Sequence, residues 1–140
     1  MQLSTRNQFP GTVVSVASGT AMSAVTVRLD SGPEVTSAIT TDSARDLGLA
    51  PGTPVRALVK STEVAVATGV VEGLSIRNRL PGVVTSVSSG AAMSTVRIAT
   101  RSGETITAAI TRDAAEELKL EPGAEVTALV KATEVSLAVE

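Results

Sequence analysis

Apolar residues alternate with small or polar residues along most of this chain. Alternation with a period of two is typical of a β-strand that has one face in a core. The clearest alternating positions are Val14, Val16, Val25, Val27, Leu29, Val55, Ala57 and Val59. Residues typical of turns separate these runs, at 18–19, 31–33 and 51–52. The pattern therefore predicts about five short strands in this half of the chain.

One stretch in each half departs from this alternation. Residues 42–49 (DSARDLGL) and 113–120 (DAAEELKL) indicate a helix of one or two turns. The candidate caps are Thr41 or Asp42 in the first helix, with Gly48 at its end, and Asp113 in the second, paired with Glu116 as in a capping box. Each half thus consists of strands, a short helix and further strands, which suggests a small closed barrel of the OB type.

The two halves are copies of each other. Shifting the sequence by 71 residues aligns residues 3–67 with 74–138 without a gap, and roughly 36 of the 65 positions are identical. Residues 68–73 (TGVVEG) have a glycine at each end and are predicted to be a linker. We therefore expect one domain at residues 1–67 and a second at 74–140.

Composition restricts the possible chemistry. The chain has no Cys and no His, so thiol chemistry, disulfides and the commonest metal ligands are excluded, and no pattern of a catalytic nucleophile with a base is present. We expect no enzymatic activity, no metal site and no cofactor. A net charge of −2 provides no general field for nucleic acid or membranes. Phe9 is the only aromatic residue, and such a small aliphatic core favours oligomerisation.

No apolar run in the chain approaches the roughly 18 residues that a membrane span requires. The N-terminal residues, MQLSTRNQFPG, also lack the basic and apolar segments of a secretory leader. We therefore expect a protein of the cytoplasm.

Several separated motifs resemble the Mop or TOBE domain. They are STRNQFPGTVVSV at 4–16 and AITTDSARDLGLAPGTPVRALVKSTEVAVA at 38–67, and they recur as LSIRNRLPGVVTSV at 74–87 and AITRDAAEELKLEPGAEVTALVKATEVSLA at 109–138. The arrangement resembles the molbindins, which carry two Mop domains in one chain and bind molybdate or tungstate. We expect neither the DNA-binding domain of the related regulators nor the nucleotide-binding domain of the related transporter ATPases.

The resemblance implies an all-β protein of two tandem five-stranded OB-like barrels, each with one short helix. It also implies a homotrimer in which six Mop domains form a ring, with oxyanion sites between domains. A tetrahedral dianion presents acceptor oxygens only, so hydroxyls, cationic side chains and backbone amides suit it. The expected role is the storage or homeostasis of molybdate or tungstate in the cell.

The family's motifs imply the same set of oxyanion-binding positions in each copy. In the first copy these are Ser4, Arg6, Thr40, Ser43, Lys60 and Ser61, and in the second they are Ser75, Arg77, Thr111, Ala114, Lys131 and Ala132. Ala114 and Ala132 lack a hydroxyl, so only their amides can donate and the second site is expected to differ in affinity. The segments that begin the helices also offer backbone amides with partial positive charge.

Two other functions are compatible with a small barrel of this type. A structural or interaction module without a ligand would share the same fold. A nucleic-acid binder would need aromatic platforms and a basic groove, which one phenylalanine and a slightly negative charge do not supply. Oxyanion binding is therefore the leading hypothesis.

Overall fold

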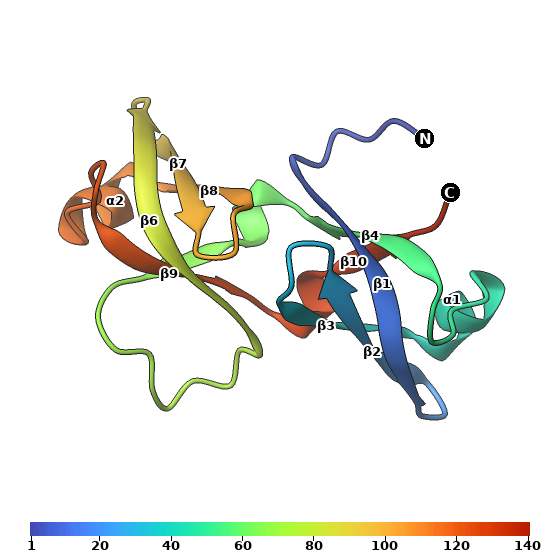
Figure 1. The fold of residues 1–140 in the computed structure, drawn as a ribbon. Helices are drawn as coiled ribbons and strands as arrows, with labels where there is room; N and C mark the ends of the chain where they lie inside the picture. Colours follow the sequence, from blue (N-terminus) through green and yellow to red (C-terminus); the bar gives the residue numbers. More distant parts are fainter.

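The computed structural model describes all 140 residues and contains two curled antiparallel sheets of five strands each (Figure 1). The first half contains β1 (Asn7–Ser18), β2 (Met22–Leu29), β3 (Glu34–Thr40), α1 (Thr41–Asp46), β4 (Pro54–Val59), the 3-10 helix η1 (Ser61–Glu63) and β5 (Ala65–Ala67). The second contains β6 (Asn78–Ser89), β7 (Met93–Thr100), β8 (Thr105–Thr111), α2 (Arg112–Glu117), β9 (Glu125–Val130), η2 (Ala132–Glu134) and β10 (Ser136–Ala138). The all-β prediction, with one short α-helix in each half, is confirmed.

The last strand of each half joins the sheet of the other half. The strand orders are β10-β4-β1-β2-β3 and β5-β9-β6-β7-β8. Ala65 of β5 pairs with Leu129 of β9, and Leu137 of β10 pairs with Ala57 of β4. Each curled sheet is therefore a half-barrel completed by a strand from the other repeat, and the spatial unit differs from the sequence repeat by one strand.

A β-bulge near the middle of β1 changes which valine is buried. Val13 pairs with Val27 of β2, but Ser15 pairs with Thr26, so β1 contains one extra residue at this point. A bulge moves the inward-facing positions by one residue. Val13 is therefore buried, whereas Val14 is only half-buried, and the alternation predicted from Val14 does not extend across the bulge.

Threonines cap both short helices. The Thr40 hydroxyl oxygen accepts the amide of Ser43 at 3.1 Å, and Thr111 accepts the amide of Ala114 at the same distance. The predicted caps, Thr41 or Asp42 in the first copy and Asp113 in the second, were therefore one or two residues too late. A threonine at the end of an extended strand already has the non-helical backbone that an N-cap requires.

One hydrophobic cluster extends across both halves. It includes Phe9, Val35 and Val59 of the first repeat together with Leu80 and Ile106 of the second. Because β3 packs on η2 and β8 packs on η1, each half covers part of the other's core. The small aliphatic residues of one repeat are thus buried with the help of its copy.

Two asparagines connect the repeats with hydrogen bonds of strand type. The side-chain amide nitrogen of Asn78 donates to the Thr36 carbonyl at 2.8 Å, and its side-chain oxygen accepts the Thr36 backbone amide at 2.7 Å. Asn7 makes the same two contacts with Thr107, both at 2.8 Å. Both asparagines are buried. Each side chain therefore acts as an added strand residue against the edge strand of the other repeat.

Candidate functional site

Two related clefts lie where the repeats meet, and each contains one of the predicted lysines. The Lys131 cleft has a volume of about 460 Å³ and includes Thr62, Glu63, Thr111, Lys131 and Glu134 in its lining. The Lys60 cleft has a volume of about 200 Å³ and includes Thr5, Lys60, Glu63, Thr133, Glu134 and Ser136. Most lining positions correspond under the 71-residue shift. The junction thus contains two versions of one site, each built from both repeats.

An arginine and a lysine flank the end of each central strand pair. The β1–β4 ladder ends at Asn7 and Val59, which Arg6 precedes and Lys60 follows in the chain. The β6–β9 ladder ends at Asn78 and Val130, which Arg77 precedes and Lys131 follows.

None of these four cations forms an ion pair within the chain, whose ion pairs involve only Arg28, Arg45, Arg56 and Arg112. Each junction end therefore carries an arginine and a lysine that have no ionic partner within the chain.

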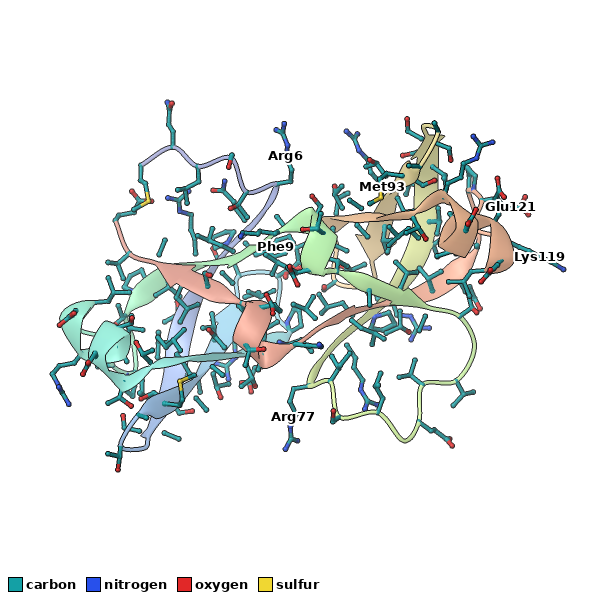
Figure 2. All side chains as sticks on the ribbon, turned by 180° about the vertical axis from the view of Figure 1, so that it is seen from behind. Arg6, Phe9, Arg77, Met93, Lys119 and Glu121 are labelled. Atoms are coloured by element: carbon teal, nitrogen blue, oxygen red, sulfur yellow. The ribbon has the colours of Figure 1, made fainter.

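The residues that precede β1 and β6 are mostly exposed. Leu3 and Thr5 line the Lys60 cleft, but Ser4 and Arg6 between and after them do not. Ser75 is also exposed and belongs to neither cleft. In Figure 2, Arg6 and Arg77 point away from the body of the protein on opposite sides of the junction. Their donor groups therefore face solvent in a single chain.

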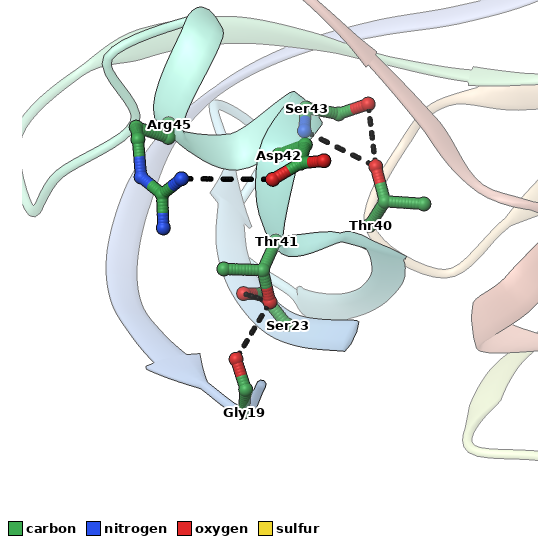
Figure 3. Close-up of polar contacts among 7 residues, drawn as sticks. All are labelled: Gly19, Ser23, Thr40, Thr41, Asp42, Ser43 and Arg45. Atoms are coloured by element: carbon green, nitrogen blue, oxygen red, sulfur yellow. Dashed lines mark hydrogen bonds and ion pairs between the residues drawn. The ribbon is translucent and has the colours of Figure 1, made fainter. Parts of the chain in front are cut away.

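The donors near α1 are engaged with one another. Thr40 donates its hydroxyl proton to the Ser43 hydroxyl at 2.8 Å and accepts the Ser43 amide (Figure 3). The amide expected to be free for an anion is thus occupied by the cap. The same is true of Ala114, whose amide is bonded to Thr111.

The hydroxyl groups of Thr111 and Ser61 donate no hydrogen bond within the chain. Thr111 accepts one bond but donates none within the chain, and it lines the Lys131 cleft. Its proton therefore remains available to a ligand. Ser61 and Ala132 begin η1 and η2 beside the lysines and are half-buried, and the Ser61 hydroxyl makes no hydrogen bond. Neither of them lines a cleft.

Of the predicted residues, the single chain thus brings together Lys131 and Thr111 in one cleft and places Lys60 in the other. The remaining predicted residues lie outside both clefts. They are Ser4, Arg6, Thr40, Ser43, Ser61, Ser75, Arg77, Ala114 and Ala132. The chain alone does not assemble the complete set.

Sequence reasoning missed the two glutamates of these clefts. Glu63 and Glu134 each line both clefts, where they place carboxylates near the lysines. The repeated string TEV was the available signal, but it does not show that the two copies meet at the junction. No group of three His, Cys, Asp or Glu side chains is arranged to hold a metal ion, and no helix is long and apolar enough to cross a membrane.

Comparison with known proteins identifies the family. The model of the TOBE domain matches residues 3–66 and again residues 74–137. The chain therefore belongs to the TOBE domain family and carries the domain twice.

Several named relatives are similar to this chain. The molybdenum-pterin-binding protein MopB of Rhodobacter capsulatus is 45% identical over 99% of the chain, and the molybdenum transport protein ModE of Azotobacter vinelandii is 39% identical over the same share. The chain spans 52% of the length of each of these two relatives. Molybdenum-pterin-binding protein 3 of Clostridium pasteurianum is 42% identical over 47% of the chain, a match that covers 97% of that protein.

A solved structure matches the whole chain. It is a crystal structure of the cytoplasmic molybdate-binding protein ModG with molybdate bound, 39% identical to this chain, with a TM-score of 0.96. The match covers 100% of both chains. That structure therefore has the same two-domain all-β architecture as this chain.

Proposed function

We propose that this pair of TOBE domains binds molybdate. The observation that carries the proposal is the match over the full length of both chains to a protein whose crystal structure holds molybdate. The cations near the junction support it, because Arg6, Lys60, Arg77 and Lys131 form no ion pair within the chain and could supply the charge that a dianion needs. The relatives are named for binding or transport, and the proposal includes no reaction.

The complete sites form between domains of a homo-oligomer in this proposal. A cleft with one lysine and two glutamates, Glu63 and Glu134, does not by itself favour an anion. Charge complementarity requires further cations, and the exposed Arg6 and Arg77 can supply them to a neighbouring copy. Ser4 and Ser75 are exposed in the same way. A homotrimer, with six domains, is the assembly we propose.

In the assembled site that we propose, the groups that contact the anion are donors, and this would discriminate among oxyanions. Near neutral pH phosphate usually carries a proton, and a buried proton without an acceptor costs roughly 1–3 kcal/mol. Molybdate and tungstate share size, charge and geometry, so we propose that both bind. The proposed setting is the cytoplasm and the proposed role is storage or homeostasis. The two sites of a chain would differ, because Ala114 and Ala132 offer no hydroxyl where Ser43 and Ser61 do.

Titration calorimetry of the assembled protein with molybdate, tungstate, sulfate and phosphate tests this proposal. Heat of binding is expected with molybdate and tungstate, and its absence with both would refute molybdate binding. An assembled protein that binds no oxyanion would instead support a structural or interaction module.

Removing the cleft lysines tests the site assignment. Lys60→Ala combined with Lys131→Ala is expected to weaken molybdate binding by more than about a hundredfold, because each charge-assisted contact contributes about 1.5–3 kcal/mol. The third lysine of the chain, Lys119, lies at the far end of the molecule in Figure 2 and provides the control. Lys119→Gly removes the same charge and should leave binding unchanged. Equal affinities for the double variant and the wild type would show that the lysines are not ligands.

A further inference from the structure

The segment that precedes β6 is held by one side chain. The guanidinium of Arg79 donates from Nε to the Ile76 carbonyl at 3.1 Å, from Nη1 to the Val71 carbonyl at 3.3 Å and from Nη2 to the Leu74 carbonyl at 2.5 Å. A planar group whose N–H donors have a fixed geometry fixes the relative positions of the groups it contacts. Arg79 thereby fixes three points along residues 71–76.

These contacts are the only hydrogen bonds that residues 68–77 make. No backbone–backbone hydrogen bond outside the strands and helices involves them, and no other side chain bonds to them. In Figure 1 this segment forms the open loop between β5 and β6. Ser75 and Arg77, two of the proposed oxyanion-binding residues, belong to it. Arg79 is thus the only residue that anchors their segment by hydrogen bonds.

In the first repeat a different side chain makes the corresponding hydrogen bond. Gln8 occupies the position equivalent to Arg79, and its amide donates to the Thr5 carbonyl at 2.8 Å, just as Arg79 donates to Ile76. Gln8 is itself oriented by Arg56, whose Nη1 donates to the Gln8 side-chain oxygen at 2.7 Å. The position thus contacts the carbonyl three residues earlier in both copies, but only Arg79 reaches two further carbonyls.

We propose that Arg79 is a positioning residue for oxyanion binding: its guanidinium holds residues 71–76 so that Ser75 and Arg77 are ordered before the anion arrives. This inference rests on the proposed function. Arg79 does not contact the anion in this account. Each of its three nitrogens donates to a carbonyl oxygen of the segment, and its contribution in this account is preorganisation.

A double-mutant cycle with molybdate titrations separates this role from a general loss of stability. Arg79→Ala is expected to weaken molybdate binding about tenfold, since two side chains must then be ordered on binding. In the background of Arg77→Ala the same substitution should have a clearly smaller effect, because the group it positions is gone. Arg101→Ala provides the control, as Arg101 is an exposed arginine of the same repeat with no side-chain hydrogen bond or ion pair. Equal effects of Arg79→Ala in both backgrounds would overturn the proposal.

Two further variants separate the effect of the hydrogen-bond donors of Arg79 from the effect of its positive charge. Arg79→Gln keeps the contact that Gln8 makes in the first repeat and is expected to recover part of the affinity without the charge. Arg79→Lys keeps the charge without the planar fork and should bind as weakly as Arg79→Ala. A lysine variant with wild-type affinity would show that charge alone matters and would refute the positioning role.

Backbone order parameters of residues 70–77 from NMR relaxation, measured without any anion, provide an independent readout. The order parameters should fall in Arg79→Ala and remain unchanged in Arg101→Ala. Equal order parameters in the wild type and Arg79→Ala would overturn the proposal whatever the affinities. A wild-type protein that binds no molybdate would refute the proposed function, while the order parameters would still decide whether Arg79 holds the segment.

Discussion

Asn78 offers the most direct test of how the two repeats are held together. Its side chain accepts the Thr36 amide at 2.7 Å and donates to the Thr36 carbonyl at 2.8 Å, and it is only 5% exposed. Asn78→Ala removes both bonds and leaves a strand amide and a strand carbonyl without partners. Because Thr36 belongs to β3 of the first repeat, the damage falls on the contact between repeats rather than on the fold of either one.

The expected loss can be estimated from these contacts. Each hydrogen bond contributes about 0.5–1.5 kcal/mol net, and a buried polar group left without a partner costs about 1–3 kcal/mol. Thr36 is half-buried, so water can reach part of the freed backbone and reduce that cost. We therefore expect Asn78→Ala to lower the free energy of unfolding by about 2–4 kcal/mol. Asn7→Ala should cost about the same, since Asn7 makes equivalent contacts with Thr107.

Urea unfolding of the assembled protein, at one fixed protein concentration, measures this loss. Thr36→Val provides a matched control, because it changes the side chain but keeps the backbone groups that Asn78 contacts. Hydrogen exchange at the Thr36 amide should accelerate in Asn78→Ala and not in Asn7→Ala. A loss below about 0.5 kcal/mol, within the range of an ordinary surface substitution, would refute the reasoning, since it would mean that water replaces both bonds without cost.

Two glycine positions give further predictions. Gly82→Ala should destabilise the protein by about 1–3 kcal/mol in thermal unfolding, because a Cβ there would collide with the Ala99 carbonyl and lie 2.9 Å from the Thr100 Cα. Gly90→Ala is the control. Its Cβ would meet only the Met93 carbonyl, at 3.6 Å, so this variant should be nearly neutral. Lys119→Gly should raise the free energy of unfolding by up to about 1 kcal/mol, because glycine adopts a positive φ without strain. Lys119 has a φ of 53°, and the equivalent residue of the first repeat is Gly48, with a φ of 64°. An unchanged or lower stability would contradict this prediction.

Much of the fold could be predicted from the sequence because alternation and turn residues act locally. The strands, the short helices and the duplication all follow from such local signals. The exchange of β5 and β10 could not be predicted in this way. Both strands pair with copies of the same Ala-Leu step, at 57–58 and 128–129, so local preference is nearly equal for either sheet. The course of residues 68–77 and the packing of both cores decide the partner instead.

The candidate site was predicted less completely. Each arginine and each lysine stands just outside the same end of a paired set of strands, and the alignment of the repeats suffices to find both copies. The glutamates of the clefts could not be found, since Glu63 and Glu134 approach each other's clefts only through the exchanged strands. The backbone amides at the helix starts are less available to an anion than the sequence predicted. The capping threonines occupy the amides of Ser43 and Ala114.

The exchange of strands also explains why stability and binding chemistry depend on the same part of the molecule. Neither repeat can complete its own sheet, because the fifth strand comes from its copy. The lysines follow β4 and β9, the strands that receive these exchanged partners. A repeat isolated from its copy would therefore lose an edge strand, the asparagine contacts and one side of each cleft together. With one aromatic residue in the chain, no larger core compensates for that loss. The duplication thus supplies within one chain both the strand that closes each sheet and the second wall of each cleft.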